Sequence, residues 1–281
     1  MKYPIIISAL LLSCSCSNAR EGVCNATYSK QDSVKCEDIL SLHFDSPTVK
    51  TTDIAKLFLG TPYQGGTLDR DTTEKIVVRL DSLDCTTFVE TVTAITKCIK
   101  SEKNSFTEYV KALEEIRYRD GICNGYTSRL HYFSEWILNN QEMGIVEEIY
   151  IDNATITEER TINFMGCNAD KYPGIRNDSD LAQIKAIERA FSAYPFNYIP
   201  KDKVTEIEVE NIKEGDIIAI VTDIEGLDIS HVGFATYVNG EVHLLHASSG
   251  KKEVVIDPLS LSDYLARYKH HKGIKVIRVM L

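Results

Sequence analysis

Residues 83–90, Leu-Asp-Cys-Thr-Thr-Phe-Val-Glu, open an amphipathic helix with a cysteine in its first turn. Apolar side chains recur at helical spacing from Phe88 to Ile99, which predicts a helix with one buried face. Asp84 stands where an N-cap belongs, so Cys85 should begin the helix. Backbone N–H groups and the helix dipole at that position favour a thiolate, the nucleophilic form of cysteine. The stretch therefore predicts a nucleophile that needs a partner base.

A predicted β-hairpin near the other end of the sequence supplies two candidate bases. Asn239-Gly240 is a strong signal for a two-residue turn, and this turn sets His246 opposite Gly233. His231 and His246 then share one sheet face as diagonal neighbours, about 7–8 Å apart along the backbone. The small residues Gly233 and Ala235 leave room on that face, where we expect the cysteine-bearing helix to pack. The opposite face is expected to be core and carries Val232, Phe234, Val238 and Leu245.

These segments resemble the NlpC-type cell-wall cysteine peptidases, a papain-like α+β superfamily. The matching motifs, in family order, are Gly60-Thr61-Pro62-Tyr63-Gln64-Gly65-Gly66, Asp84-Cys85-Thr86-Thr87-Phe88-Val89, Ser230-His231-Val232-Gly233 and His246-Ala247. The Cys-Thr-Thr-Phe-Val-Glu form and a long insert between cysteine and histidine are similar to a branch described as N-acetylmuramoyl-L-alanine amidase-like. The resemblance implies a papain-like core with N-terminal helices packed on an antiparallel sheet.

The resemblance also implies roles for the candidate residues. Cys85 would attack an amide carbonyl and form an acyl-enzyme, His231 would move its proton, and His246 would orient His231. The implied substrates are peptidoglycan fragments, cut between N-acetylmuramic acid and L-alanine. Substrate contacts are expected from Tyr63, Asp84, Ser230, Arg129 and Tyr132.

Each substrate contact has a structural alternative. Asp84 is also a helix cap, Ser230 a strand-end hydroxyl, and Tyr63 a packing residue. The polar and aromatic residues of the insert suit sugar stacking and carboxylate contacts, with Arg129 as the candidate partner of a substrate carboxylate. They equally suit bracing the insert against the core, which is the favoured interpretation for Trp136. His131 and Tyr132 belong to the same run.

Other functions are compatible with the same residues. A D-glutamyl–diaminopimelate endopeptidase would use the same machinery, and a transglutaminase-like acyltransferase would pass the acyl group to an amine. A non-catalytic muropeptide-binding lipoprotein would need neither Cys85 nor the two histidines, so their joint presence argues against it.

Composition limits the class of protein. The 281 residues are 43% hydrophobic, enough for a proper core, and the formal charge of −10 argues against nucleic acid as a partner. We expect a monomeric catalytic domain over residues 46–281, with an insert at about 118–200 and a polar tether at 20–45. No zinc-like cysteine or histidine spacing is present, so no metal and no cofactor are predicted.

The first 19 residues are predicted to be a signal peptide, which implies export to the periplasm or attachment to a bacterial membrane. Leu11-Leu12-Ser13-Cys14 resembles a lipobox, in which Cys14 would be lipidated; cleavage after Ala19 is the alternative. In an oxidising compartment Cys24 and Cys36 could form a disulfide, and the pairing of Cys98, Cys123 and Cys167 is left open.

The remaining pattern predicts an α+β chain. Helices are expected at 52–59, 85–100, 105–117, 129–140, 180–191 and 261–269. Strands are expected at 146–151, 205–210, 216–222, 231–238, 241–247, 253–256 and 274–280, with a loop-rich stretch at 153–178.

Overall fold

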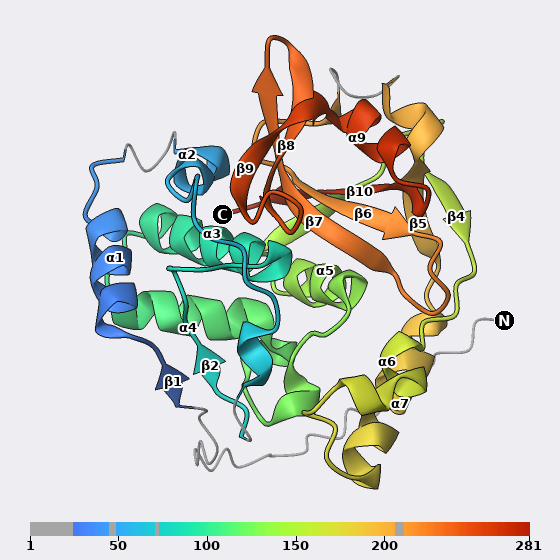
Figure 1. The fold of residues 1–281 in the computed structure, drawn as a ribbon, viewed down its shortest axis with the longest axis horizontal. Helices are drawn as coiled ribbons and strands as arrows, with labels where there is room; N and C mark the ends of the chain where they lie inside the picture. Colours follow the sequence, from blue (N-terminus) through green and yellow to red (C-terminus); the bar gives the residue numbers. More distant parts are fainter. Residues whose placement is uncertain (1–24, 45–48, 71–72, 206–210) are drawn as a thin grey trace, which may run out of the picture.

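The chain folds around one antiparallel sheet of eight strands, as the computed structural model of residues 25–44, 49–70, 73–205 and 211–281 shows (Figure 1). The strand order is β4-β5-β10-β6-β7-β8-β9, and β3 also pairs with β10. The strands are β3 (Val146–Ile149), β4 (Ile156–Glu158), β5 (Phe196–Pro200), β6 (Ile217–Thr222), β7 (Ile229–Val238), β8 (Glu241–Ser248), β9 (Glu253–Ser260) and β10 (His271–Val279). The predicted α+β class with an antiparallel sheet is confirmed.

Helices cover the sheet, and a short parallel pair lies outside it. The helices are α1 (Lys30–Leu40), α2 (Thr51–Lys56), α3 (Cys85–Lys100), α4 (Phe106–Arg117), α5 (Phe133–Glu142), α6 (Phe164–Cys167), α7 (Asp178–Ser192) and α9 (Leu261–Arg267). The separate pair joins β1 (Ala26–Thr27) to β2 (Ile76–Val77). Among the helices that the structure describes, none has the length and apolar character needed to cross a bilayer.

The predicted hairpin register is confirmed next to the turn, where β7 and β8 pair from Val238 opposite Glu241 to Phe234 opposite Leu245. The paired residues end there, one position before the predicted pair of Gly233 with His246. Asn239 and Gly240 both have positive φ, 53° and 89°, as a two-residue turn of this kind requires.

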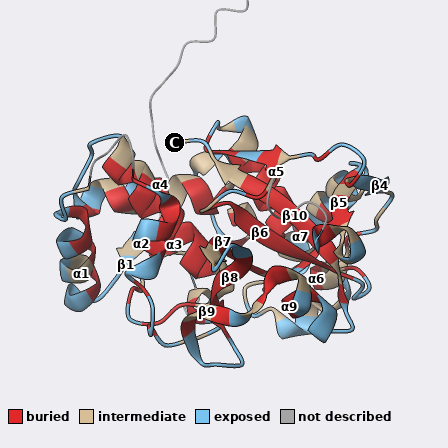
Figure 2. Cartoon of the chain, turned by 90° about the horizontal axis from the view of Figure 1, so that it is seen from above, coloured by how far each residue is buried: buried red, intermediate tan, exposed pale blue. Residues whose placement is uncertain are grey.

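Helix α3 packs on the opposite face of this hairpin from the one predicted. Phe88 of α3 meets Phe234 edge-to-face, with ring centroids 5.6 Å apart. The space beside Gly233 is already filled, because a Cβ added there would lie 2.8 Å from the Cβ of His246. Ala235 packs instead in a second core with Leu265 of α9. Both faces of the sheet are therefore buried (Figure 2).

Helix α3 is buried on every side rather than on one face. All positions from Thr87 to Thr96 are buried, including the threonines between the apolar residues. The sheet covers one side of the helix, and α1, α2 and α4 contact the others. The apolar residues alone therefore predict too small a buried surface for α3, because its threonines are also packed against neighbouring elements.

The segment predicted to be a polar tether contains a packed helix. In α1, Ser29 and Asp32 form a reciprocal capping box, and Cys36, Ile39 and Leu40 are buried. The predicted signal peptide, with Cys14, lies outside the described residues, as does most of the strand predicted at 205–210.

The insert is built into the sheet rather than lying over it. It contains α5, β3, β4, α6, α7 and β5, and both β3 and β5 pair with β10. Strands β4 and β5 were not predicted, and α5 begins at Phe133, four residues after the predicted start. Two strands thus hold the insert against the sheet that carries the histidines.

Close approach of β8 to Gly233 makes that glycine a sensitive position. We expect Gly233→Ala to lower the free energy of unfolding by about 1–3 kcal/mol, because β8 must move away from the new methyl group. The control is Gly250→Ala, where the added Cβ would meet only Ser248 Oγ, at 3.9 Å. Urea denaturation measures both variants; equal stability of the two would show that β8 accommodates a side chain at position 233.

Candidate active site

The first turn of α3 is fixed by a reciprocal cap. Asp84 accepts a hydrogen bond from the backbone N–H of Thr87 at 2.8 Å, and the Thr87 hydroxyl accepts one from the backbone N–H of Asp84 at 2.9 Å. Cys85 is the first residue of the helix, as predicted. The cap therefore sets both the start of α3 and the direction of the cysteine side chain.

Hydrogen-bond donors from two elements surround the Cys85 thiol. The backbone N–H of Val232 on β7, and the hydroxyl and backbone N–H of Thr86, lie close enough to the sulfur to lower the pKa of the thiol. Val232 directly follows His231, so the thiol lies against the strand that carries the first histidine. Cys85 is also near Tyr63 and Tyr264, because a charge on Cys85 contributes to the raised pKa of both phenol groups.

The two predicted histidines are in direct contact. His231 Nε2 and His246 Nδ1 are 2.5 Å apart, and the rings are nearly perpendicular, with centroids 4.8 Å apart. This contact leaves Nδ1 of His231 free of the pair. Tyr264 of α9, which the sequence did not single out, packs its ring 5.5 Å from that of His246.

Burial controls the charge state of these groups. Burial raises the pKa of Cys85 to about 11; the charge of Asp84 raises it further, and the N–H and hydroxyl groups of Val232 and Thr86 lower it by less. Burial, with His246 and His271 nearby, lowers the pKa of His231 to about 3, and burial lowers that of His246 to about 4. The predicted thiolate is therefore not favoured at rest, because loss of solvation outweighs the helix dipole. Burial thus favours the neutral form of both Cys85 and His231.

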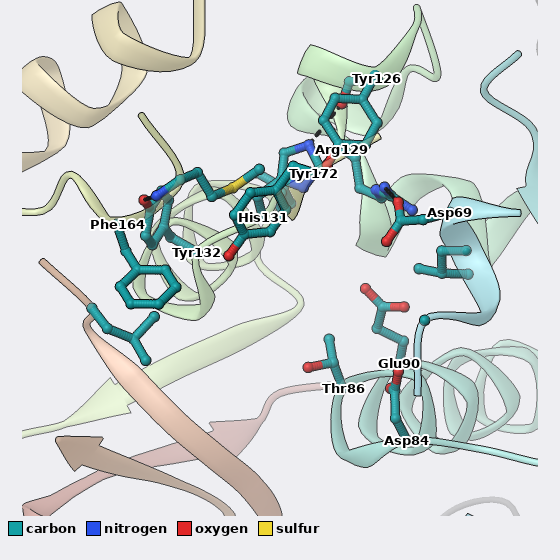
Figure 3. Close-up of a pocket in the computed structure, with 15 residues that line it drawn as sticks. Asp69, Asp84, Thr86, Glu90, Tyr126, Arg129, His131, Tyr132, Phe164 and Tyr172 are labelled. Carbon is teal, nitrogen blue, oxygen red and sulfur yellow. Dashed lines mark hydrogen bonds and ion pairs between the residues drawn. The ribbon is translucent and has the colours of Figure 1, made fainter. Parts of the chain in front are cut away.

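A cavity of about 180 Å³ lies between the first turn of α3 and the insert, and Cys85 itself does not line it (Figure 3). Asp84 and Thr86, which flank Cys85, line one side of it together with Asp69 and Glu90. The opposite side comes from the insert and is mostly aromatic; it includes Tyr126, His131, Tyr132, Phe164 and Tyr172. An acidic wall thus faces an aromatic wall across the cavity.

The acidic wall is held by two arginines. Arg117 of α4 pairs with Glu90 at 2.7 Å, and both side chains are 2% exposed. Arg129 forms an ion pair with Asp69, lies 3.6 Å from Glu74, and stacks on the ring of Tyr126. Its guanidinium is already neutralised, which weakens the prediction that Arg129 binds a substrate carboxylate.

The other predicted contacts are distributed around the thiol and the insert. Burial, then the charges of Cys85 and Asp84, raises the pKa of Tyr63 to about 12, which places Tyr63 near Cys85. The exposed Ser230 has its hydroxyl 3.4 Å from the carbonyl of Ile220 and does not line the cavity. Asp84 does line it and is also the helix cap.

The residues of the insert both line the cavity and hold the insert together. Tyr132 lines the cavity, but its hydroxyl donates to Glu188 at 2.7 Å and accepts from the Met165 N–H at 2.8 Å. His131 Nε2 is 2.8 Å from the carbonyl of Tyr126, and burial lowers the pKa of His131 to about 3. Trp136 is fully buried and stacks on Phe133, which agrees with its predicted bracing role.

Sequence reasoning missed four residues of this region: Asp69, Glu90, Asp257 and Tyr264. Glu90 was quoted in the cysteine motif, but nothing in the sequence indicated its arginine partner. Asp257 lies 3.6 Å from His246 and could have been found by extending the hairpin register to the next strand.

A family model described as N-acetylmuramoyl-L-alanine amidase-like matches residues 53–274. The chain belongs to the AmiA-like family. A crystal structure of an N-acetylmuramoyl-L-alanine amidase from Bacteroides uniformis is 36% identical, with a TM-score of 0.79, covering 83% of this chain and 98% of that one. No curated protein matches the chain.

Two further solved structures share the fold of this AmiA-like chain. A putative xylanase from Bacteroides fragilis is 38% identical, with a TM-score of 0.75, covering 80% of this chain and 99% of that one. A protein from Legionella pneumophila is 24% identical, with a TM-score of 0.62, covering 89% of this chain and 95% of that one, and it supports the fold alone.

Of the five cysteines in the part of this AmiA-like chain that the structure describes, four are free thiols. Cys36 and Cys98 are buried, and Cys167 is exposed. Because Cys36 is free, the disulfide considered between Cys24 and Cys36 does not form; Cys123 is disulfide-bonded. Within the described ranges, no group of three or more His, Cys, Asp or Glu side chains could hold a metal ion, and the absence of a metal stays a prediction.

The raised pKa of Cys85 predicts a slow thiol in the absence of substrate. Its rate of alkylation by iodoacetamide should rise about tenfold per pH unit from pH 6 to 9.5 without a plateau, because the thiolate fraction grows until the pH nears about 11. Peptide mapping by mass spectrometry follows Cys85, with the exposed Cys167 as an internal reference. A plateau below pH 8 would reveal a thiolate–imidazolium pair instead.

The buried pair beneath the cavity predicts a large effect on stability. Arg117→Ala should lower the free energy of unfolding by about 3–5 kcal/mol, because it leaves the Glu90 carboxylate buried without a partner. The double variant Glu90→Leu, Arg117→Met removes both charges and should lose clearly less. Chemical denaturation compares them; if the double variant is the less stable of the two, packing rather than charge explains the loss.

Proposed function

We propose that the protein is an exported cysteine amidase that cuts peptidoglycan fragments between N-acetylmuramic acid and L-alanine. The observation that carries this proposal is the meeting of two distant segments: the thiol at the start of α3 lies near the Val232 N–H of the hairpin, one residue after His231, which contacts His246 at 2.5 Å. A nucleophile, a base and an orienting group at one point fit nucleophilic catalysis. Family membership supports the peptidoglycan substrate.

The reaction follows from this arrangement. His231 Nδ1 takes the proton from the Cys85 thiol as the sulfur attacks the lactyl carbonyl carbon of the muramic acid. The backbone N–H of Cys85, at the start of the helix, stabilises the oxyanion. The C–N bond then breaks, His231 gives its proton to the alanine amine, and the lactyl group remains on sulfur as a thioester. Water activated by His231 hydrolyses the thioester and restores the thiol.

Proton transfer during attack also explains how a thiol with a pKa of about 11 can react. His231 is unprotonated at neutral pH, because its pKa is lowered to about 3, so Nδ1 has a lone pair for the thiol proton; the same low pKa makes the transfer unfavourable until bond formation to carbon drives it. The ion pair need only form as the new S–C bond develops, when the oxyanion adds a compensating charge. The resting enzyme thus keeps a protonated, poorly reactive sulfur.

The cavity beside Cys85 suits the sugar side of this bond. Its aromatic wall, with Tyr126 and Tyr172, can stack on a sugar ring, and its acidic wall can accept hydrogen bonds from hydroxyl and amide groups. This wall keeps an excess of negative charge, because Asp69 and Glu74 share the single guanidinium of Arg129, and the excess favours neutral groups over anionic ones. A neutral N-acetylated sugar meets these conditions.

Export remains part of the proposal and rests on the N-terminal sequence. Attachment through a lipidated Cys14 would keep the enzyme at a membrane, and cleavage after Ala19 would release it into the periplasm. A monomer acting on small soluble fragments fits both cases.

The test uses the mature protein and defined muropeptides, with products identified by mass spectrometry. The protein should release an intact stem peptide and a free sugar, and Cys85→Ala should lower the rate at least a thousandfold, because the acyl-enzyme cannot form. Cys167→Ala, which removes an exposed free thiol, is the matched control and should retain activity.

Other products would assign other functions. A sugar still carrying L-alanyl-D-glutamate would indicate an endopeptidase that cuts before diaminopimelate. Fragment binding without any cleavage would make the protein a non-catalytic muropeptide-binding protein.

A further inference from the structure

Three neighbouring strands place ionisable side chains in a row on one sheet face. His231 of β7 contacts His246 of β8, and the other ring nitrogen of His246, Nε2, is directed at Asp257 of β9. The distance from Nε2 to Asp257 Oδ2 is 3.6 Å, slightly longer than a hydrogen bond, and this buried nitrogen has no hydrogen-bond partner among the described residues. His246 is 1% exposed and Asp257 7% exposed. The row ends in a carboxylate away from solvent.

An irregularity in β9 sets the position of this carboxylate. Val255 pairs with His246 in register, so Asp257, two residues further on, shares its sheet face. The register shifts at this point, between the pairs of His243 and Leu245, and such bulges redirect side chains next to active sites. The carbonyl of Asp257 lies 2.9 Å from His243 Nδ1, which fixes the backbone.

The contact between the two rings allows only two proton arrangements, because one nitrogen must donate to the other. If His246 Nδ1 donates, its Nε2 presents a lone pair to Asp257, and His231 must carry its proton on Nδ1. If His231 Nε2 donates, His246 carries its proton on Nε2, directed at Asp257, and His231 Nδ1 has a free lone pair. A carboxylate beside Nε2 favours the second arrangement.

We infer that Asp257 is a positioning residue that sets the proton arrangement of both histidines and thereby keeps His231 Nδ1 free to accept the thiol proton. This inference rests on the proposed cysteine amidase function and extends its machinery by one residue. When His231 becomes protonated, the negative charge of Asp257, on the far side of His246, stabilises the imidazolium. Asp257 contacts neither the thiol nor the cavity lining and acts only through His246.

A comparison of Asp257→Asn with Asp257→Ala tests the inference, because the two replacements should rank in an unusual order. Asp257 Oδ1 accepts the Leu259 N–H at 3.0 Å, so the asparagine carbonyl keeps that bond and turns its NH₂ group towards His246. That group donates to Nε2, which reverses the proton arrangement and blocks His231 Nδ1. We expect kcat to fall at least a hundredfold in Asp257→Asn but only about tenfold in Asp257→Ala, where water can replace the carboxylate.

The matched control is Asp223→Asn, which changes an exposed aspartate 2.6 Å from His270 and away from the site. It should keep the activity of the unchanged protein. If Asp257 had only a structural role, the alanine variant would be at least as impaired as the asparagine variant, and this order would overturn the inference.

Nitrogen NMR of ¹⁵N-histidine-labelled protein gives a readout that does not depend on activity. His246 should carry its proton on Nε2 in the unchanged protein and on Nδ1 in Asp257→Asn. A proton on Nδ1 in the unchanged protein would overturn the inference even if the variants fail to fold. If the unchanged protein cleaves no muropeptide, the proposed function fails, while the NMR result still decides what Asp257 does to His246.

Discussion

Burial of the central turns of helix α3, from Thr87 to Thr96, is the constraint on which the rest of the structure depends. A charged group in those turns needs a partner within the protein. Glu90 finds that partner in Arg117, which also donates to the carbonyl of Val77 at 2.7 Å. One buried charge pair therefore joins α3, α4 and β2. A helix held on all sides cannot shift along its axis, so its first turn stays fixed against β7.

Local chemistry made much of the site readable from the sequence. The Asp84 cap, the turn at Asn239-Gly240 and the pairing of His231 with His246 each follow from interactions between residues close in the chain or in one hairpin. The capping box of Ser29 and Asp32 was equally readable, but the polar composition around it favoured a tether. Short-range hydrogen bonding is thus a better guide here than overall polarity.

Long-range packing decided what the sequence could not indicate. The face that α3 covers depends on which side of the hairpin α9 occupies, and the two segments are far apart in the chain. The state of the Cys85 thiol depends on desolvation by the whole fold, which opposes the local helix dipole. The sequence shows Arg129 as a cation without a partner, whereas in the fold it pairs with Asp69, sixty residues earlier in the chain. Each of these outcomes requires the assembled molecule.

The order of strands has a consequence for how the molecule is made. Strand β10 follows every other strand along the chain, yet it lies inside the sheet, between β6 and the strands of the insert. A polypeptide that emerges from its amino end can form α3 and the histidine hairpin early, and Arg129 can already pair with Asp69, but β3 and β5 cannot be joined to β6 until residues 271–279 arrive. The sheet is therefore completed last.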